Sequence, residues 1–208
     1  MEKFKLILAS ASPRRKELLG HLKIPFEIIT KNIPEESDAT DPVEFTREIA
    51  RDKGKAVLEE LLALRSQENF FVVSADTIVC LDGKIYGKPK DRDEARAFLN
   101  ELAGRTHSVF TAVVIQTKDK EFSFVEESKV TFDKISESLM ERYLATGDSL
   151  DKAGAYGIQG ASLTFISNVD GCYANVVGFP LSRFVKETEK FMTSLSPKEG
   201  TWFDSFHS

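Results

Sequence analysis

Charged side chains of both signs in this chain are of the types that phosphate chemistry requires. The cations are Arg14, Arg15, Lys53 and Lys88, and the carboxylates are Glu35 and Asp76. Hydrolysis of a phosphate ester asks a protein to position a polyanion, neutralise its charge, hold a divalent cation and orient or deprotonate a water molecule. Arginine and lysine suit the first two tasks, and carboxylates suit the last two. The set therefore indicates phosphate-ester hydrolysis, if the fold brings these residues together.

Asp76 lies in the middle of the most apolar segment of the chain, residues 70–81, which we predict to be a central strand buried on both faces. An ionised carboxylate there loses several kcal/mol of solvation unless it meets a cation, a hydrogen-bond donor or the floor of an open cleft. The alternative is a salt-bridged or turn-forming aspartate at a strand end. Of the single residues, Asp76 is the strongest candidate for function, either as a general base or as a metal ligand.

The paired arginines follow an apolar strand and a short turn in residues 6–15. Ser12 is expected to cap a helix, and Pro13 suits its first position because that residue needs no intrahelical N–H bond. The free amides of a helix start attract anions, whereas arginines there oppose the helix dipole. A bound polyanion would explain Arg14 and Arg15. The alternative is an ordinary turn whose arginines face water.

Standard phosphate loops and two other types of site are missing from the sequence. Residues 151–160 carry a GxxGxxG pattern that is neither the dinucleotide GxGxxG nor the Walker GxxxxGK[ST] motif, so a plain loop is a fair alternative to a ligand-binding one. The three histidines lack ligand spacing, which argues against a zinc or other transition-metal site. Ser10 and Ser12 lie outside any GxSxG motif, so Ser-His-Asp chemistry has little support.

Composition narrows the possible classes of protein. With 208 residues and 41% apolar content, the chain can bury a substantial core. Its formal net charge of -5 argues against general nucleic-acid binding, so any basic site must be local. The two cysteines lack CxxC spacing, and no signal peptide or membrane-length apolar run stands out. We expect a cytoplasmic protein with reduced thiols and neither a nucleic-acid nor a membrane partner.

The apolar patterns predict alternating helices and strands that mix parallel and antiparallel pairing. Helices are expected over residues 13–22, 43–64, 91–102 (starting at Asp91 or Asp93), 137–146 (with capping-box spacing from Ser138 to Glu141) and from Pro180 onward. Strands are expected over residues 6–8, 26–29, 70–81, 85–90, 109–117, 121–132 and 163–166.

Two connections bear on the candidate site. The polar loop 31–42 places Glu35 over a cleft in one interpretation, and is a solvated acidic loop in the other. The Asp-Gly pair at residues 82–83 predicts a tight hairpin that brings Lys88 back toward Asp76. The hairpin would therefore add a cation to the surroundings of the buried carboxylate.

Six motifs occur in sequence along the chain: Ala-Ser-Ala-Ser-Pro-Arg-Arg (9–15), Ser-Ala-Asp-Thr-Ile-Val (74–79), Gly-Lys-Pro-Lys (87–90), Gly-Arg-Thr-His (104–107), Asp-Lys-Ala-Gly-Ala-Tyr-Gly-Ile-Gln-Gly (151–160) and Val-Val-Gly-Phe-Pro-Leu (176–181). Over about residues 4–192 they resemble the Maf family of nucleoside triphosphate pyrophosphatases. The resemblance implies a two-lobed α/β fold of Maf/ITPase-like type, with a mixed, bent sheet flanked by helices and a central cleft.

The same resemblance sets an expected domain organisation. We predict a single Maf-like pyrophosphatase domain over residues 1–192 and a C-terminal extension over residues 193–208. The extension is polar with scattered aromatic side chains. Trp202, Phe203 and Phe206 either dock it on the core or leave it disordered.

The resemblance also implies an activity. Members of the family cleave a nucleoside triphosphate between the α- and β-phosphates, giving the monophosphate and pyrophosphate with a divalent cation, Mg²⁺ or Mn²⁺. The sequences Ala-Asp-Thr and Gly-Ile-Gln-Gly are similar to those of the branch that cleaves dTTP and UTP. We therefore expect dTTP, UTP and modified pyrimidine nucleotides as substrates, and a homodimer as the assembly.

Roles for individual residues follow from the motifs that they match. Asp76 matches the proton acceptor, with metal ligation left open, and Lys88 is the second expected catalytic residue. Glu35 matches the metal site, although Glu36 could take its place. The expected substrate-binding residues are Ser10, Arg14, Arg15, Lys53, Thr77 and Gln159, of which Arg14, Thr77 and Gln159 match positions of base selection. An amide such as that of Gln159 can donate and accept at once, as the edge of uracil or thymine requires.

Two other functions compete with this hypothesis. One is a nucleotide-binding regulator of cell division and septum formation without significant turnover, because the family has been linked to septum inhibition. The other is a phosphatase that releases orthophosphate. The products formed from a triphosphate distinguish all three.

Overall fold

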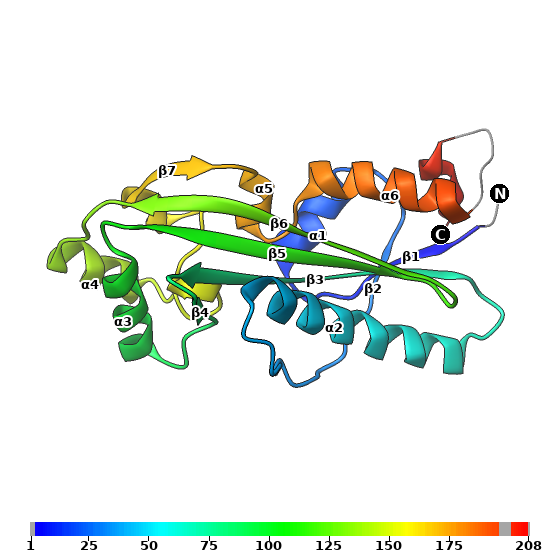
Figure 1. The fold of residues 1–208 in the computed structure, drawn as a ribbon, viewed down its shortest axis with the longest axis horizontal. Coiled ribbons are helices and arrows are strands. Elements are labelled where there is room, and N and C mark those ends of the chain that lie inside the picture. The colour runs from blue at the N-terminus through cyan, green and yellow to red at the C-terminus, as the bar shows by residue number, and fades with distance from the viewer. Residues whose placement is uncertain (1–2, 196–200, 208) are drawn as a thin grey trace.

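The computed structural model describes residues 3–195 and 201–207 and is organised around one curled sheet (Figure 1). Within these residues the sheet has seven strands in the order β2–β1–β3–β5–β6–β7, with β4 paired to β3. Pairing is parallel from β1 to β2 and β3, and antiparallel elsewhere, which confirms the predicted mixed sheet. The strands are β1 (Lys5–Leu8), β2 (Glu27–Ile28), β3 (Phe70–Leu81), β4 (Lys84–Tyr86), β5 (Thr106–Gln116), β6 (Glu121–Phe132) and β7 (Ile166–Asp170).

Helices flank the sheet on both faces, as the predicted fold class requires. They are α1 (Pro13–Gly20), α2 (Pro42–Leu64), α3 (Arg92–Leu102), α4 (Glu137–Ala145), α5 (Tyr173–Val177) and α6 (Leu181–Leu195), with short 3-10 turns at η1 (Ala153–Ala155), η2 (Ala161–Thr164) and η3 (Trp202–Ser205). Asp41 caps α2 and Asp91 caps α3, each through a side-chain oxygen that accepts backbone N–H bonds. No helix in the described ranges is both long and apolar enough to cross a membrane.

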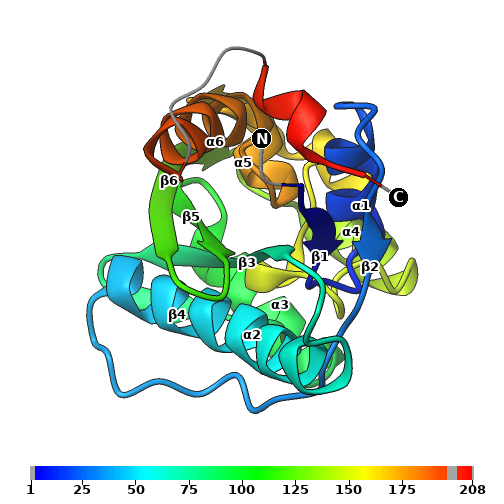
Figure 2. The same cartoon turned by 90° about the vertical axis from the view of Figure 1, so that its right-hand side faces the viewer.

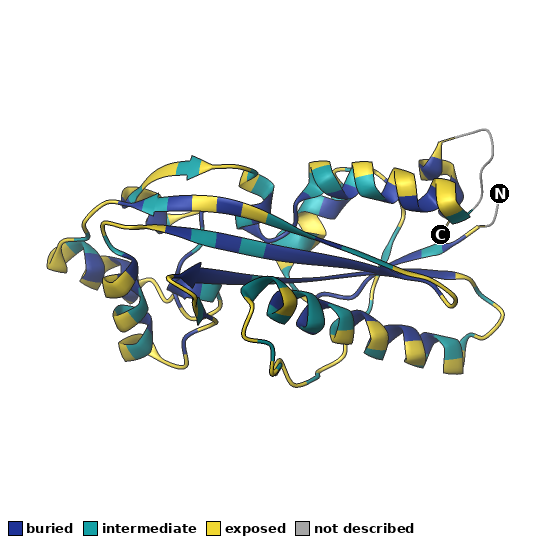
Figure 3. Cartoon of the chain, viewed as in Figure 1, coloured by how far each residue is buried: buried dark blue, intermediate teal, exposed yellow. Residues whose placement is uncertain are grey.

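The strand β3 is a central strand of the sheet, and apart from Thr77 every one of its residues is buried (Figure 3). Alternate side chains serve opposite faces. Phe71, Val73 and Ala75 enter a first core with α1 and α6, whereas Phe70 and Val72 pack against α2. The end-on view shows the sheet curving around the first core, with α2 on the outer face (Figure 2). Burial on both faces confirms the prediction made for residues 70–81.

A second core lies at the other end of β3, beneath α3 and α4. Positive φ angles at Asp82 and Gly83 make the tight hairpin that returns the chain as β4. Tyr86 of β4 packs in this core with Leu99 of α3. The two cores therefore form two lobes that share one long strand.

The second core also buries His107, whose Nε2 is 2.7 Å from the hydroxyl oxygen of Tyr156. Burial lowers the pKa of His107 from 6.5 to about 4. Below pH 6.5 the unfolded chain therefore binds a proton that the folded chain does not, so stability decreases as pH falls toward 4. We expect the His107 contribution to cost about 2 kcal/mol between pH 7 and pH 5.

The measurement is urea unfolding of the wild-type chain and of His107→Phe at several pH values. The variant should lose less unfolding free energy than wild type on acidification from pH 7 to pH 5. If the unfolding free energies of the two proteins fell by the same amount between pH 7 and pH 5, His107 would not be the source of the pH dependence. The absolute stability of the variant does not affect the test, because the comparison is between the changes in unfolding free energy with pH.

Several local predictions are wrong, each for a physical reason. Ser12 stands at the N-cap position of α1, but its side chain makes no capping hydrogen bond. The cap of α4 is Ser136, which accepts from the amide of Leu139, and Ser138 lies two residues further on, inside the helix. A strand predicted over residues 163–166 is instead η2 followed by the start of β7, because the chain turns after Gly160 with a φ of 119°. The sequence pattern did not predict α5.

The tail docks on the first core rather than standing apart from it. Trp202 and Phe206 are buried there, and the backbone of Phe4 pairs with that of Phe206. The helix α6 continues to Leu195, three residues past the predicted domain limit. The division at residue 192 stays a prediction.

Candidate active site

A cavity of about 1170 Å³ opens between the two lobes, where α1, α2, β3 and the glycine-rich stretch approach one another. All of the site residues expected from the sequence contribute to its wall: Ser10, Arg14, Arg15, Glu35, Lys53, Asp76, Thr77, Lys88 and Gln159. They come from segments up to 149 residues apart, from Ser10 to Gln159, so the fold brings the whole set together. Their individual roles stay predictions.

An ammonium group joins the two carboxylates in this cavity. Nζ of Lys53 donates to Oδ1 of Asp76 at 2.7 Å and lies 2.8 Å from Oε1 of Glu35. The Asp76 side chain is only 11% exposed, and Lys53 supplies the cation that its burial demands. Glu35, and not Glu36, makes the contact with Lys53 and lines the cavity. Burial is the largest single influence on the pKa of Glu35 and raises it, but the hydrogen bond and charge of Lys53, with the charges of Lys88 and Arg15, together leave that pKa below its ordinary value.

Gly54 makes this contact possible, because it lets α2 lie close against β3. A Cβ atom at Gly54 would fall 2.6 Å from Oγ of Ser74 and 2.4 Å from Oε1 of Gln116. In the same contact, the hydroxyl of Ser74 donates to the carbonyl oxygen of Ala50 at 2.7 Å. The next residue before Gly54 is Lys53, which is thereby held over Asp76. Gly54 was not among the residues expected to matter, although a glycine in the middle of a long predicted helix was the available signal.

The guanidinium of Arg15 is bound to the protein itself. It donates to the carbonyl oxygens of Gly178 and Ala75 at 2.9 and 2.8 Å, and to the hydroxyls of Thr77 and Ser10 at 3.0 and 3.3 Å. These partners belong to three separate parts of the chain. Arg15 therefore joins the start of α1 to β3 and to the turn before α6. Most of its N–H donors are bonded to protein oxygens, so few are left for a ligand.

Thr77 follows Asp76 in β3, so the two side chains lie on opposite faces of the sheet. Its Oγ1 accepts from Arg15 and lies 3.0 Å from Oγ1 of Thr111. Thr111 in turn donates to the carbonyl oxygen of Asn175 in α5. The hydroxyl of Thr77 is thus engaged by the protein, which leaves its methyl group as the part available to shape the cavity wall.

The glycine-rich stretch closes one side of the cavity and carries Gln159, which is exposed there. Gly154 has a φ of 67° and approaches Val79 so closely that a Cβ atom would lie 2.8 Å from its Cγ2. Gly157 leaves space for the side chain of Lys152 in the same way. The spacing of these glycines is therefore explained by packing within the protein.

Asp148, Asp151 and Lys152 also line the cavity, and the sequence alone assigned no role to them. Arg14 forms an ion pair with Asp151 at 3.4 Å, and Asp151 also pairs with Lys152. Lys152 donates to the carbonyl oxygen of Asp148 at 2.8 Å. Asp151 and Lys152 open the fifth motif of the sequence, so their place in a long motif was the available signal. This network links α1 to the stretch that carries Gln159.

Lys88 follows β4 and is exposed at the cavity wall. Among residues 3–195 and 201–207, its ammonium has no hydrogen bond or ion pair, although its charge helps to lower the pKa of Glu35 behind the larger effects of burial and Lys53. An exposed and unpaired cation of this kind is ready to bind an incoming anion.

Glu35 and Asp76 are two carboxylates of the cavity wall that share one ammonium, and they offer oxygen donors to a hard cation. Mg²⁺ is commonly held by one or two carboxylates, with phosphate oxygens and water completing its shell. Glu35 and Asp76 fit that donor set because both are bound to the same ammonium, which places them within reach of one ion. Within the described residues no group of three or more His, Cys, Asp and Glu side chains gathers to hold a metal.

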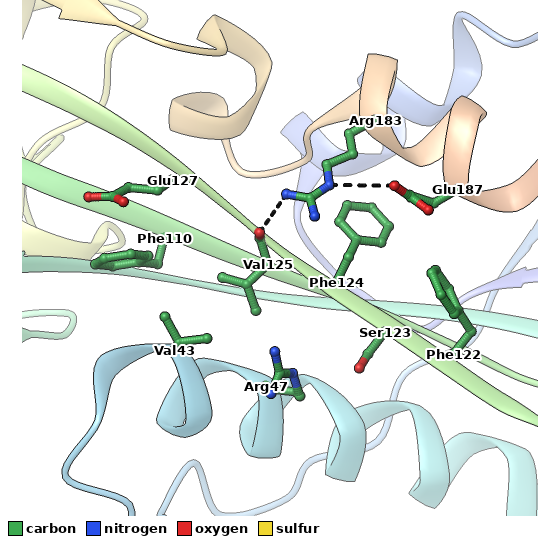
Figure 4. A pocket seen from close by; sticks show the side chains of 10 residues that line it. All are labelled: Val43, Arg47, Phe110, Phe122, Ser123, Phe124, Val125, Glu127, Arg183 and Glu187. Atoms are coloured by element: carbon green, nitrogen blue, oxygen red, sulfur yellow. Dashed lines mark hydrogen bonds and ion pairs between the residues drawn. The ribbon is translucent and has the colours of Figure 1, made fainter.

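A second cavity, of about 390 Å³, lies on the outer surface between α2, the β5–β6 pair and α6 (Figure 4). Phe110, Phe122 and Phe124 form part of its wall, and Arg183 donates to the carbonyl oxygen of Val125 at 2.7 Å. None of the site residues expected from the sequence lines it. The residues expected to form the site therefore line the larger cavity and not this one.

Known proteins resemble this chain over most of its length. The family described as Maf-like protein matches residues 5–191. A dTTP/UTP pyrophosphatase of Bacillus cytotoxicus is 42% identical, over 92% of this chain and 98% of the relative, and one of Bacillus cereus is 42% identical over 90% and 95%. A solved structure, the Ham1 protein of Staphylococcus aureus, overlaps with 62% of this chain and 71% of its own, at a TM-score of 0.44 and 13% identity.

Proposed function

The chain belongs to the Maf family, and on that premise we propose that it hydrolyses dTTP and UTP, and modified pyrimidine nucleotides, to the monophosphate and pyrophosphate. The observation that carries the proposal is the group Glu35–Lys53–Asp76 on the wall of the central cavity. The cavity volume of about 1170 Å³ is ample for a nucleotide. Relatives at 42% identity are named for the same reaction.

The residues divide the work of hydrolysis. Lys88, which is exposed and has no ion pair within the described part of the chain, binds the triphosphate and neutralises charge that develops as the anhydride bond breaks. Asp76 accepts the proton of the attacking water, and the bond between the α- and β-phosphates breaks with pyrophosphate as the leaving group. Glu35 and Asp76 would hold a divalent cation, Mg²⁺ or Mn²⁺, which supplies charge neutralisation and makes water more acidic.

Base selection is assigned to the side of the cavity where α1 meets the glycine-rich stretch. Gln159 reads the edge of the pyrimidine, because its amide both donates and accepts. Arg14 is held toward that side by Asp151. Thr77 contributes shape through its methyl group, since its hydroxyl is bound to Arg15. Ser10 and Arg15 reach the triphosphate side, where Arg15 chiefly keeps the wall in place.

The test is a panel of nucleoside triphosphates incubated with the purified chain and Mg²⁺ or Mn²⁺, with the products identified. Monophosphate and pyrophosphate from dTTP and UTP are expected. Release of orthophosphate would make the protein a phosphatase, and binding without turnover of every nucleotide would leave the regulator of septum formation as the function.

Replacement of Lys88 by alanine should reduce kcat/KM for the triphosphate by roughly tenfold or more, because an unpaired cation at the cavity wall is lost. The measurement is the steady-state rate of pyrophosphate release from dTTP. Lys90→Ala is the matched control, because Lys90 is two residues away with a side chain 85% exposed and lies outside the cavity wall. An unchanged kcat/KM in Lys88→Ala would remove Lys88 from the site.

Location and assembly form the remaining part of the proposal. A cytoplasmic location is supported by Cys80 and Cys172, which are both free thiols in the structure. The homodimer, and the expected lack of nucleic-acid and membrane partners, stay predictions.

A further inference from the structure

Lys53 occupies an unusual position, because its ammonium bridges both of the carboxylates that are proposed to hold a divalent cation. The two N···O distances are 2.7 Å to Asp76 and 2.8 Å to Glu35. The Lys53 side chain is 17% exposed, so its ammonium has exchanged most of its water for these oxygens. Close packing of α2 against β3 at Gly54 keeps it there.

A divalent cation that used Glu35 and Asp76 together would meet this ammonium at very short range. Like charges a few ångströms apart repel strongly in a partly buried site, where water screens them less. The cation can therefore bind well only if Lys53 moves away. Lysine is suited to such movement, because its compact charge sits on a flexible stem.

A triphosphate would give Lys53 a new anionic partner in the same cavity. We propose that Lys53 is an exchangeable counter-ion: it neutralises Glu35 and Asp76 in the nucleotide-free protein, keeps a free divalent cation out, and transfers to phosphate oxygens when the nucleotide arrives. Metal and nucleotide then bind cooperatively, each strengthening the other by the same factor. The nucleotide part of this inference rests on the proposed function, whereas the metal part needs only that Glu35 and Asp76 hold a divalent cation, whatever the reaction.

The first experiment measures Mn²⁺ binding to the full chain without nucleotide, by the electron paramagnetic resonance signal of free Mn²⁺. Lys53→Met should bind Mn²⁺ roughly tenfold more tightly than wild type, because the competing ammonium is gone. Lys152→Met is the matched control. Its side chain lines the same cavity and is similarly sheltered, at 12% exposed, but its ammonium forms an ion pair with Asp151 and donates to the backbone carbonyl oxygen of Asp148. The control should stay within about twofold of wild type.

The second experiment repeats the titration of wild type with α,β-methylene-dUTP, whose α–β linkage cannot be hydrolysed. Mn²⁺ affinity should rise roughly tenfold in wild type and far less in Lys53→Met. Equal Mn²⁺ affinity of Lys53→Met and wild type without nucleotide would overturn the proposal, as would a wild-type affinity that the nucleotide leaves unchanged. If Lys53→Met does not fold, the Mn²⁺ affinity of wild type with and without nucleotide still tests the proposal. If the protein hydrolyses no nucleotide, the Mn²⁺ affinities of wild type and Lys53→Met without nucleotide still test it.

Discussion

Asp76→Asn is expected to reduce turnover of dTTP by roughly a hundredfold or more while the protein keeps its fold. Asparagine has the same shape and can still accept the hydrogen bond from Lys53, so the packing of β3 is preserved. It carries no negative charge and cannot take the proton of the attacking water. The loss should therefore appear in kcat, with thermal unfolding close to that of wild type.

The same variant distinguishes the two roles that Asp76 could take. If Asp76 acts chiefly as a metal ligand, raising the Mn²⁺ concentration should restore most of the turnover. If it acts as the general base, saturating metal should leave the defect in place. Asp119→Asn, in the exposed turn between β5 and β6, controls for removal of a carboxylate as such. Wild-type turnover in Asp76→Asn would refute both roles.

Arg15→Met is expected to destabilise the fold by about 3–5 kcal/mol, which for a chain of this size lowers Tm by roughly 10 °C. The substitution leaves two carbonyl oxygens and two hydroxyls without the donor that now joins them. Arg15→Lys should recover little, because one ammonium cannot reach four acceptors that a planar guanidinium serves. The measurement is thermal and urea unfolding.

The neighbouring arginine provides the control. Arg14 pairs with Asp151 across an exposed gap of 3.4 Å, and such pairs contribute at most about 1 kcal/mol. Arg14→Met should therefore alter nucleotide preference more than stability. Similar losses of stability in the two variants would show that Arg15 is not the structural member of the pair.

Local signals made much of the fold predictable. The strand β3 follows from a long apolar run, and the hairpin follows from Asp-Gly at residues 82–83, where both residues adopt positive φ. Asp41 and Asp91 mark the starts of α2 and α3 by the chemistry of their side chains. Ser136 and Ser138 show the limit of this approach, because two serines two residues apart offer equivalent caps and tertiary packing selects between them.

The composition of the site was predictable from residue types, but its internal contacts were not. A cation near Asp76 was required by burial, yet the rotation of α2 that selects Lys53 depends on the packing of Gly54 against Ser74. The partners of Arg15 include two carbonyl oxygens, which carry no signal in a sequence. Asp151 and Lys152 open the fifth motif, but the sequence could not assign them a role, since their importance lies in how they reach Arg14 and the carbonyl oxygen of Asp148.

The docking of the tail has a consequence for biosynthesis. Phe4 is translated well before its neighbours Trp202 and Phe206 in the first core, and its backbone is bonded to those of Ser205 and His207. That core cannot close until residue 206 has been translated. Until residues 202–206 have been translated, the apolar side chains of β1 and α1 lack that cover, which leaves the nascent chain exposed to aggregation for that interval.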